Sequence, residues 1–279
     1  MIALMASLLL CANKRSYQNK NMQQRHLNRE TYFKEQVNTA QEFYMDYIKK
    51  YVLLQKGIKV LEIGCGEGGN LLPFAQLGCE ITGIDITPSR IEQAQQFFKA
   101  ANYEGTFIAT DFLKARAEDY GTFQLILIHD VIEHIEPKEQ FIKHIKAFAD
   151  KDTLVFWGFP AWQMPFGGHQ QICKNKIVSH LPFVHLLPAP VYRSLLDVCG
   201  IPSRELLEIK QCKVTIESFE KMMKANQHQI VNRKLWLINP HYKQKFGLQP
   251  QVLPLWLAHL RYIRNFFSTA CFYLTRITS

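Results

Sequence analysis

The chain contains 279 residues, of which 47% are apolar, 12% aromatic and 20% charged. This length and composition allow one large domain or two small domains with a buried core. They exclude an intrinsically disordered chain and a coiled coil. The formal net charge of +9 concerns surfaces and partners and says nothing about the fold.

The charge is distributed unevenly along the chain. Residues 1–58 carry 9 basic and 4 acidic side chains, residues 59–160 carry 9 and 15, and residues 161–279 carry 15 and 5. The three net charges are therefore +5, −6 and +10. An acidic segment between two basic ones indicates that the segments have different roles.

The cysteine pattern favours a reducing compartment. The seven cysteines include no Cys-x-x-Cys pair, which argues against a disulfide framework and against a zinc ribbon. We therefore expect a cytoplasmic protein.

The N-terminal residues 1–29 are predicted to form a weakly structured extension. Residues 2–11 are apolar, but no Lys or Arg precedes them and no small-x-small cleavage site follows, so they do not fit a signal peptide. Met1 and Met22 are both open as the biological start. The longest apolar run near the C-terminus, residues 266–275, is shorter than the roughly 20 residues that a membrane-spanning helix needs.

Helical spacing of apolar residues marks the first regular element. From Phe33 onward it predicts one amphipathic helix that ends before Gly57.

Residues 59–160 then alternate between predicted strands and helices. The strands predicted there are residues 59–63, 80–85, 107–110, 123–128 and 153–157. With two strands that return near residues 229–231 and 235–238, this pattern predicts an α/β fold: a Rossmann-like, doubly wound, seven-stranded, mostly parallel sheet with helices on both faces.

The alternation stops after residue 160. Residues 161–214 are rich in Pro and His and contain helical patterns near residues 174–181 and 191–199, which predicts a mainly helical lid or cap inserted after the fifth strand. The predicted division of the chain is an extension (1–29), a Rossmann-like core (30–160), a cap (161–214), a return segment (215–249) and an apolar, basic C-terminal helix (250–279).

A glycine-rich turn follows the first strand. Gly64, Gly66 and Gly68 place backbone N–H groups and a helix N-terminus against a ligand, because glycine lets the chain turn sharply and approach closely. Asp85 ends the next strand about 20 residues later, where an acid can bind the ribose hydroxyls of a nucleoside cofactor. The glycines also satisfy the dinucleotide pattern Gly-x-Gly-x-x-Gly. The acid at Glu62, just before the turn, favours S-adenosylmethionine, which has no pyrophosphate.

Four motifs in order strengthen this interpretation. They are Val60–Gly68, Gly83–Asp85, Thr110–Phe112 and His129–Ile135. This series resembles that of the class I S-adenosylmethionine-dependent methyltransferases, most of all the broad small-molecule group that includes the quinone-biosynthesis O-methyltransferases. The resemblance covers residues 30–160 well and the rest of the chain poorly.

The resemblance implies a role for each matching residue. The methionine part of S-adenosylmethionine would be held by Glu62, Gly64, Cys65, Gly66 and Gly68. The ribose and the adenine would be held by Asp85, Ile86, Asp111 and Phe112. Asp130 and Val131 would line the methyl-transfer site. A structural interpretation stays open beside these roles, with Phe112 as a core residue and Asp111 as a turn former.

Methyl transfer to a hydroxyl needs the acceptor oxygen about 3–3.5 Å from the sulfonium methyl group and a base that takes its proton. The candidate groups are His134, Glu133 and His169, which follow the fourth and fifth predicted strands and so reach the carboxyl edge of the sheet. Glu133 is equally compatible with a structural role at a helix N-terminus.

A metal site is a further hypothesis for the same residues. Asp130-x-x-Glu133-His134 with a later His resembles the metal-binding set of the small-RNA 3′-terminal 2′-O-methyltransferases, which act on a ribose. The first acid of this chain is Asp, which has a shorter reach, and the other signatures of that family are not evident. We therefore predict no metal and keep metal-assisted ribose 2′-O-methylation as a lesser alternative.

The acceptor should be selected by the segments that cover the sheet edge. Residues 161–214 are rich in Pro, Phe, Leu and His, which suits a lid over an apolar pocket. We predict a small, apolar or aromatic acceptor, methylated on oxygen. A structural cap or a homodimer contact is the alternative role of this segment.

The basic C-terminal half leaves two other partners open. Its Lys and Arg residues, with nearby Tyr and Trp, could bind RNA, and an RNA methyltransferase is the second prediction. Aromatic residues with interleaved Arg in the predicted C-terminal helix could instead contact a membrane surface. These residues are Trp256, Tyr262, Phe266, Phe267, Phe272 and Tyr273.

Overall fold

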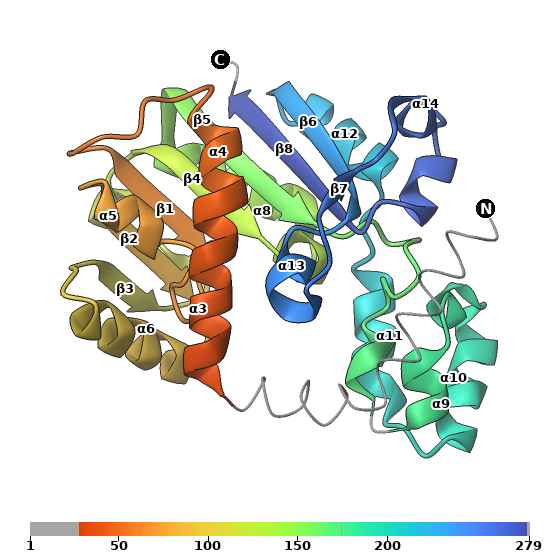
Figure 1. Cartoon of the computed structure of the whole chain (residues 1–279). Helices are drawn as coiled ribbons and strands as arrows, with labels where there is room; N and C mark the ends of the chain where they lie inside the picture. Colours follow the sequence, from red (N-terminus) through yellow and green to blue (C-terminus); the bar gives the residue numbers. More distant parts are fainter. Residues whose placement is uncertain (1–27, 174, 278–279) are drawn as a thin grey trace.

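An eight-stranded sheet with helices on both faces organises the computed structural model, which describes residues 28–173 and 175–277 (Figure 1). The strand order is β3-β2-β1-β4-β5-β8-β6-β7. Four neighbouring pairs are parallel and three are antiparallel. The predicted Rossmann-like α/β fold is confirmed. The predictions for residues 1–27 lie outside the described residues.

Five parallel strands make the first half of the sheet. They are β1 (Lys59–Ile63), β2 (Glu80–Asp85), β3 (Thr106–Ala109), β4 (Phe123–His129) and β5 (Ala149–Phe159). All five occur where the sequence predicts them, because nearly continuous apolar runs are typical of strands that are covered on both faces. β5 begins four residues before the predicted start at residue 153. The sequence pattern does not show these first residues as strand, because most of them are polar and exposed.

The C-terminal part of the chain supplies the remaining strands. They are β6 (His228–Ile238), β7 (Gln251–Val252) and β8 (Ala270–Ile277). β8 lies between β5 and β6 and is antiparallel to both. The two strands predicted at residues 229–231 and 235–238 are one strand with a register shift between Ile230 and Asn232. The two-residue β7 therefore adds an edge strand, and β8 replaces one of the predicted seven.

The prediction of a C-terminal helix over residues 250–279 is wrong. Within the described part of this segment, α14 (Leu255–Ala258) is the only α-helix, and β8 is an inner strand of the sheet. β8 is covered on both faces, so its apolar residues show no period that separates a helix from a strand. Phe272 and Tyr273 are both 0% exposed, which removes them from any surface contact.

Helices cover the two faces of the sheet (Figure 1). On the first face lie α3 (Arg29–Thr39), a π-helical turn (Ala40–Tyr44), α4 (Met45–Ile48), α5 (Leu72–Gln76) and α6 (Pro88–Ala100). On the second face lie α7 (Ala117–Tyr120), α8 (Lys138–Ile145) and α12 (Ile216–Ala225). Among residues 28–173 and 175–277, no helix is long and apolar enough to cross a membrane.

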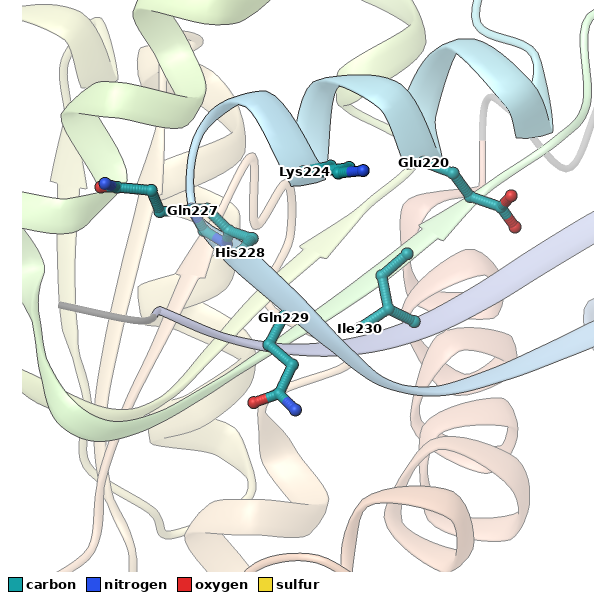
Figure 2. Close-up of a pocket in the computed structure, with 6 residues that line it drawn as sticks. All are labelled: Glu220, Lys224, Gln227, His228, Gln229 and Ile230. Atoms are coloured by element: carbon teal, nitrogen blue, oxygen red, sulfur yellow. The ribbon is translucent and has the colours of Figure 1, made fainter.

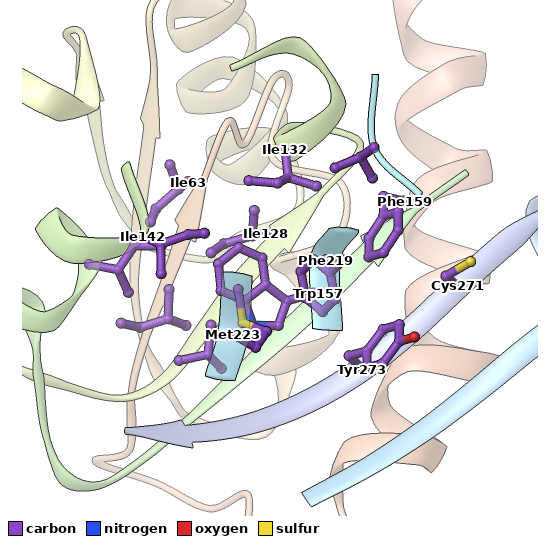
Figure 3. Packing of buried hydrophobic residues seen from close by; sticks show 14 of the residues in the cluster. Ile63, Ile128, Ile132, Ile142, Trp157, Phe159, Phe219, Met223, Cys271 and Tyr273 are labelled. Carbon is purple, nitrogen blue, oxygen red and sulfur yellow. The ribbon is translucent and has the colours of Figure 1, made fainter. Parts of the chain in front are cut away.

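Successive side chains of a strand point to opposite faces of the sheet, so the core has two layers. In β5, Trp157 packs in one layer and Phe156 in the other. Figure 3 shows the first layer, where Phe219 of α12 lies close to Trp157 and Phe159, with ring centroids 5.4 and 4.7 Å apart. The ring of Tyr273 from β8 stacks on Phe159. β8 is therefore part of the core that supports the end of β5.

The segment after β5 forms a cap with its own small core. Its helices are α9 (Lys176–His180), α10 (Ala189–Val198) and α11 (Ser203–Gln211). Its apolar cluster consists of Val178, Val184, Tyr192, Leu196, Leu206 and Leu207. The described part is mainly helical, as the sequence predicts, although the pattern does not reveal α11. After β6, α13 (His241–Phe246) packs beside α3.

Candidate active site

The glycine loop after β1 contacts the loop after β4. Gly64, Gly66 and Gly68 have φ values of 75°, 53° and 79°, which favour glycine. A Cβ on Gly64 would lie 2.4 Å from Val131 Cγ2. Cys65 is buried, with its Sγ close to Gly83 of β2. The loop therefore needs glycine for its conformation and for its contact with Val131, and Cys65 has only its backbone to offer a ligand.

We expect Gly64→Ala to destabilise the protein more than the matched control Gly57→Ala. Both glycines have positive φ, but a Cβ on Gly57 would meet no atom within 4 Å. Gly57→Ala should cost the left-handed strain alone, about 1–2 kcal/mol. Gly64→Ala should add an overpacking cost of about 1–3 kcal/mol. Urea denaturation measures both free energies, and equal losses would contradict the close contact with Val131.

Asp85 connects the loops after β1 and β2. Its Oδ2 accepts a hydrogen bond from Gly66 N–H at 2.9 Å, and its Oδ1 accepts one from Thr87 N–H at 2.8 Å. The next residue, Ile86, is 71% exposed. The carboxylate is thus held at the sheet edge beside an apolar side chain that is free to contact a ligand.

Glu62 carries a buried carboxylate oxygen without a partner. Its Oε1 accepts a hydrogen bond from Asn70 Nδ2 at 2.7 Å, while Oε2 has no hydrogen-bond partner. The side chain is 1% exposed, and burial raises the pKa of Glu62 to about 8. Buried polar atoms are normally satisfied, so Oε2 is a candidate acceptor for a ligand donor.

The N-terminal helix α3 covers this loop through contacts that the sequence analysis does not predict. Arg29 Nη1 forms an ion pair with Glu67 Oε1 at 2.8 Å. A Cβ on Gly69 would lie 2.7 Å from the carbonyl oxygen of Phe33. α3 therefore closes one side of the glycine loop.

Asp111 and Phe112 follow β3 and have different environments. Asp111 Oδ1 accepts a hydrogen bond from Leu113 N–H at 3.0 Å and so caps a short 3₁₀ turn. Phe112 is 6% exposed, and its ring lies 4.9 Å from that of Phe148. These contacts match the structural interpretations of both residues, and their adenine-binding roles stay predictions.

A tyrosine–histidine pair lies at the end of β4. The hydroxyl of Tyr44 and Nε2 of His129 are hydrogen-bonded at 2.8 Å, and His129 Nδ1 lies 3.4 Å from Asp130 Oδ2. Asp130 has a φ of 54°, a conformation that is uncommon outside glycine and often occurs at functional sites. Tyr44 belongs to the π-helical turn, another feature that recurs at such sites. Sequence reasoning misses this pair, because nothing in the pattern of a helix says which strand end it reaches.

Glu133, His134 and His169 come together at the same edge. One ligand atom from each lies within 4.8 Å of the others, and the two imidazole rings meet edge to face at 5.0 Å. Glu133 is 6% exposed, and neither carboxylate oxygen has a hydrogen-bond partner. Burial, with the nearby charge of Asp130, raises the pKa of Glu133 well above its usual range. This group could exchange protons or hold a divalent cation.

His169 belongs to the cap and lies at the carboxyl edge of the sheet, where the sequence analysis predicts methyl transfer. It has a φ of 56°, and burial, assisted by the neighbouring His134, lowers its pKa to about 4. Its ring is therefore neutral near pH 7. By contrast, His185 of the cap is fully buried, and its Nε2 contacts the carbonyl oxygen of Trp162 at 2.8 Å, so its role is in packing.

A separate pocket of about 390 Å³ lies at the start of β6 (Figure 2). It is lined by Glu220, Lys224, Gln227, His228, Gln229 and Ile230. β6 runs in the same direction as β5, because both are antiparallel to β8. The start of β6 is therefore at the edge of the sheet opposite to the glycine loop, and this pocket is not part of the candidate active site.

Comparison with known protein families shows similarity to methyltransferases. The family model described as "Methyltransferase domain" matches residues 34–164. This stretch contains the glycine loop, Asp85 and the end of β4, and it is similar to known methyltransferase domains. The match ends where the cap begins.

Two curated relatives differ in the atom that they methylate. Norajmaline N-methyltransferase of Rauvolfia serpentina is 37% identical over 94 residues, 33% of this chain and 32% of the relative. Ubiquinone biosynthesis O-methyltransferase of Mesorhizobium japonicum (strain LMG 29417 / CECT 9101 / MAFF 303099) is 33% identical over 91 residues, 31% of this chain and 34% of the relative. The similarity thus covers about a third of the length of each relative.

Solved structures share the fold over most of the chain. The plantazolicin methyltransferase BpumL is 14% identical, with a TM-score of 0.55 over 93% of this chain and 91% of that chain. Magnesium protoporphyrin IX methyltransferase from Synechocystis PCC 6803, solved with bound SAM, is 14% identical, with a TM-score of 0.51 over 88% of this chain and 80% of that chain. These likenesses concern the class I fold alone.

Proposed function

We propose that this protein transfers a methyl group from S-adenosylmethionine to an oxygen atom of a small, apolar or aromatic acceptor. The observation that carries the proposal is the sheet edge made by Glu62, the glycine loop and Asp85. There, a buried carboxylate oxygen of Glu62 lacks a partner, while Asp85 holds the loop in place.

The residues of this edge fit S-adenosylmethionine. Glu62 Oε2 would accept a hydrogen bond from the ammonium group of the methionine part, since a buried carboxylate favours a charged donor. Asp85 would bind the ribose hydroxyls, Ile86 would cover one adenine face, and Asp111 with Phe112 would bind the adenine edge and plane. When bound, the cofactor supplies a methyl group on a positively charged sulfur.

The proton of the acceptor hydroxyl would be taken by the group of Glu133, His134 and His169. His134 is exposed and its ring meets that of His169, so we propose one of its ring nitrogens as the base. His169, neutral near pH 7, would orient the acceptor or the His134 ring by a hydrogen bond. Glu133 would stabilise the protonated imidazole. Asp130 and Val131 would line the transfer site.

The acceptor class is inferred from the cap. Because His169 of the cap meets His134 after β4, the cap reaches the edge where methyl transfer would occur. Its first residues include Trp162 and Met164, which are 8% and 7% exposed, and such apolar surroundings suit an apolar acceptor. Oxygen is favoured over nitrogen because a hydroxyl needs the base that this group offers.

Transfer of a labelled methyl group tests the proposal. The purified protein is incubated with radiolabelled S-adenosylmethionine and fractionated cell extract, and label is measured in lipid, small-molecule, RNA and protein fractions. We expect label in a small organic-soluble product. Label in RNA would favour the second candidate function, and failure to bind S-adenosylhomocysteine would contradict the enzyme class.

The RNA alternative is less favoured because several basic side chains are already paired. Arg233, Arg264 and Lys243 form ion pairs with Glu220, Glu217 and Glu42, respectively. These charges are partly neutralised and contribute less to phosphate binding. A homodimer and a cytoplasmic location stay predictions.

A further inference from the structure

The segment of chain that connects β7 to β8 carries several exposed apolar side chains. We call them the apolar tip and define it as Leu255, Trp256, Leu260, Tyr262, Ile263 and Phe266. Leu255, Trp256 and Tyr262 are 77%, 69% and 64% exposed. Figure 1 shows α14, which carries the first two residues, at the outer edge of the molecule beyond β6 and β7. Adjacent exposed apolar residues of this size commonly mark a binding surface.

A buried polar network holds the apolar tip in place. Glu217 of α12 accepts hydrogen bonds from Tyr262 N–H at 3.0 Å, Arg264 Nε at 3.0 Å and Asn265 Nδ2 at 2.6 Å. Arg264 and Asn265 are 4% and 0% exposed. Tyr262 also has a φ of 65°, which costs backbone strain. The network therefore fixes the segment with its apolar side chains directed outwards.

The C-terminal segment that carries the apolar tip is basic. Residues 221–279 contain 9 Lys and Arg residues and no Asp or Glu. Two acids of α12, Glu217 and Glu220, are both paired with Arg264 of this segment. Arg261 and Lys221 are exposed, and Lys221 lies one helical turn from Glu217 on the same face of α12. Apolar and cationic groups are thus presented together on this segment.

We propose that the apolar tip docks on an anionic phospholipid surface. Trp256 and Tyr262 have the amphipathic rings that favour the membrane interface, and Leu255 with Ile263 would enter the acyl boundary. Arg261 and Lys221 would be attracted to anionic headgroups. A second copy of this chain is a poorer occupant, because pairing two tips would bring two basic surfaces together.

The cap lies beside the proposed docking surface. The ring of Phe183 in the cap is 6.2 Å from that of Phe266, so docking would place the cap next to the bilayer. The proposal does not depend on the proposed function, because vesicle binding is measured without methyl transfer. The two are therefore tested separately.

Vesicle sedimentation of the full chain tests the docking. The vesicles contain phosphatidylcholine alone or phosphatidylcholine with phosphatidylglycerol. We expect binding to the anionic vesicles that weakens with added salt, and a loss of about tenfold or more in the triple variant Leu255→Ser, Trp256→Ser and Ile263→Ser. The matched control, Leu53→Ser with Leu77→Ser, removes apolar residues that are 69% and 43% exposed elsewhere and should bind as the wild type does. Thermal melts establish that both variants fold.

Fluorescence gives an independent readout. Trp157, Trp162 and Trp236 are 0%, 8% and 4% exposed, so a blue shift of emission on adding anionic vesicles should come from Trp256 and disappear in Trp256→Phe. The proposal is overturned by absence of wild-type binding or by an unchanged triple variant. An equal loss in the control would also overturn it, as would a wild-type dimer that the triple variant converts to a monomer without vesicle binding.

Discussion

The variant His134→Ala should lower kcat about 10²- to 10⁴-fold, the contribution typical of a positioned base. The substrate for this measurement is the acceptor that the label-transfer assay identifies. Affinity for S-adenosylhomocysteine should stay within about twofold, because the residues proposed to hold the cofactor belong to other loops. His134→Gln is the matched variant: it keeps a hydrogen-bonding side chain but cannot take a proton, so it should lose as much activity as His134→Ala.

Two outcomes would change this assignment. An unchanged kcat in His134→Ala would remove the base role. Loss of wild-type activity in EDTA, restored by Mg²⁺ or Mn²⁺, would show that Glu133, His134 and His169 hold a cation, contrary to the prediction of no metal.

The pH dependence of activity provides a separate test. The lowered pKa of His169, about 4, keeps its ring neutral above that pH, so its protonation should affect activity only as the pH falls towards 4.

Asp85→Ala should weaken binding of S-adenosylhomocysteine about 100-fold or more, because hydrogen bonds to a charged group contribute about 1.5–3 kcal/mol each. Two such bonds to the ribose hydroxyls would be lost. The carboxylate also accepts hydrogen bonds from the N–H groups of Gly66 and Thr87, so both loops should become less well held. Titration calorimetry measures the affinity.

The controls separate binding from folding. Glu80 is an exposed acid at the opposite end of β2, so Glu80→Ala removes the same charge without touching the proposed site and should bind normally. Asp85→Asn keeps the shape of the side chain and the acceptor for one loop, and should lose less affinity than Asp85→Ala. Unchanged affinity in a folded Asp85→Ala protein would contradict the cofactor assignment.

The predictable part of the site lies in short, continuous stretches of chain. Glu62, Gly64 and Asp85 follow from a strand, a turn and a second strand, where local backbone requirements decide which residue types fit. His134 and His169 are predicted as separate candidates at strand ends. Their edge-to-face contact at 5.0 Å depends on how the cap folds over the sheet.

The unpredicted contacts join distant parts of the chain. Tyr44 reaches His129, and Arg29 reaches Glu67, although neither pair has a spacing that could signal contact. Hydrophobic burial is not directional, so the apolar face of a helix indicates that it packs without indicating where. The same limit applies to the contact between Phe112 and Phe148, whose rings lie 4.9 Å apart although nothing in the spacing of the two residues signals it.

The sequence by itself determined the alternating α/β core and the glycine loop with its acids, because periodicity and backbone conformation are local properties. Only the tertiary structure decided that residues 270–277 form a strand between β5 and β6, because a segment buried on both faces has no distinguishing period. That placement moved Phe272 and Tyr273 into the core and left Leu255, Trp256 and Tyr262 at the surface.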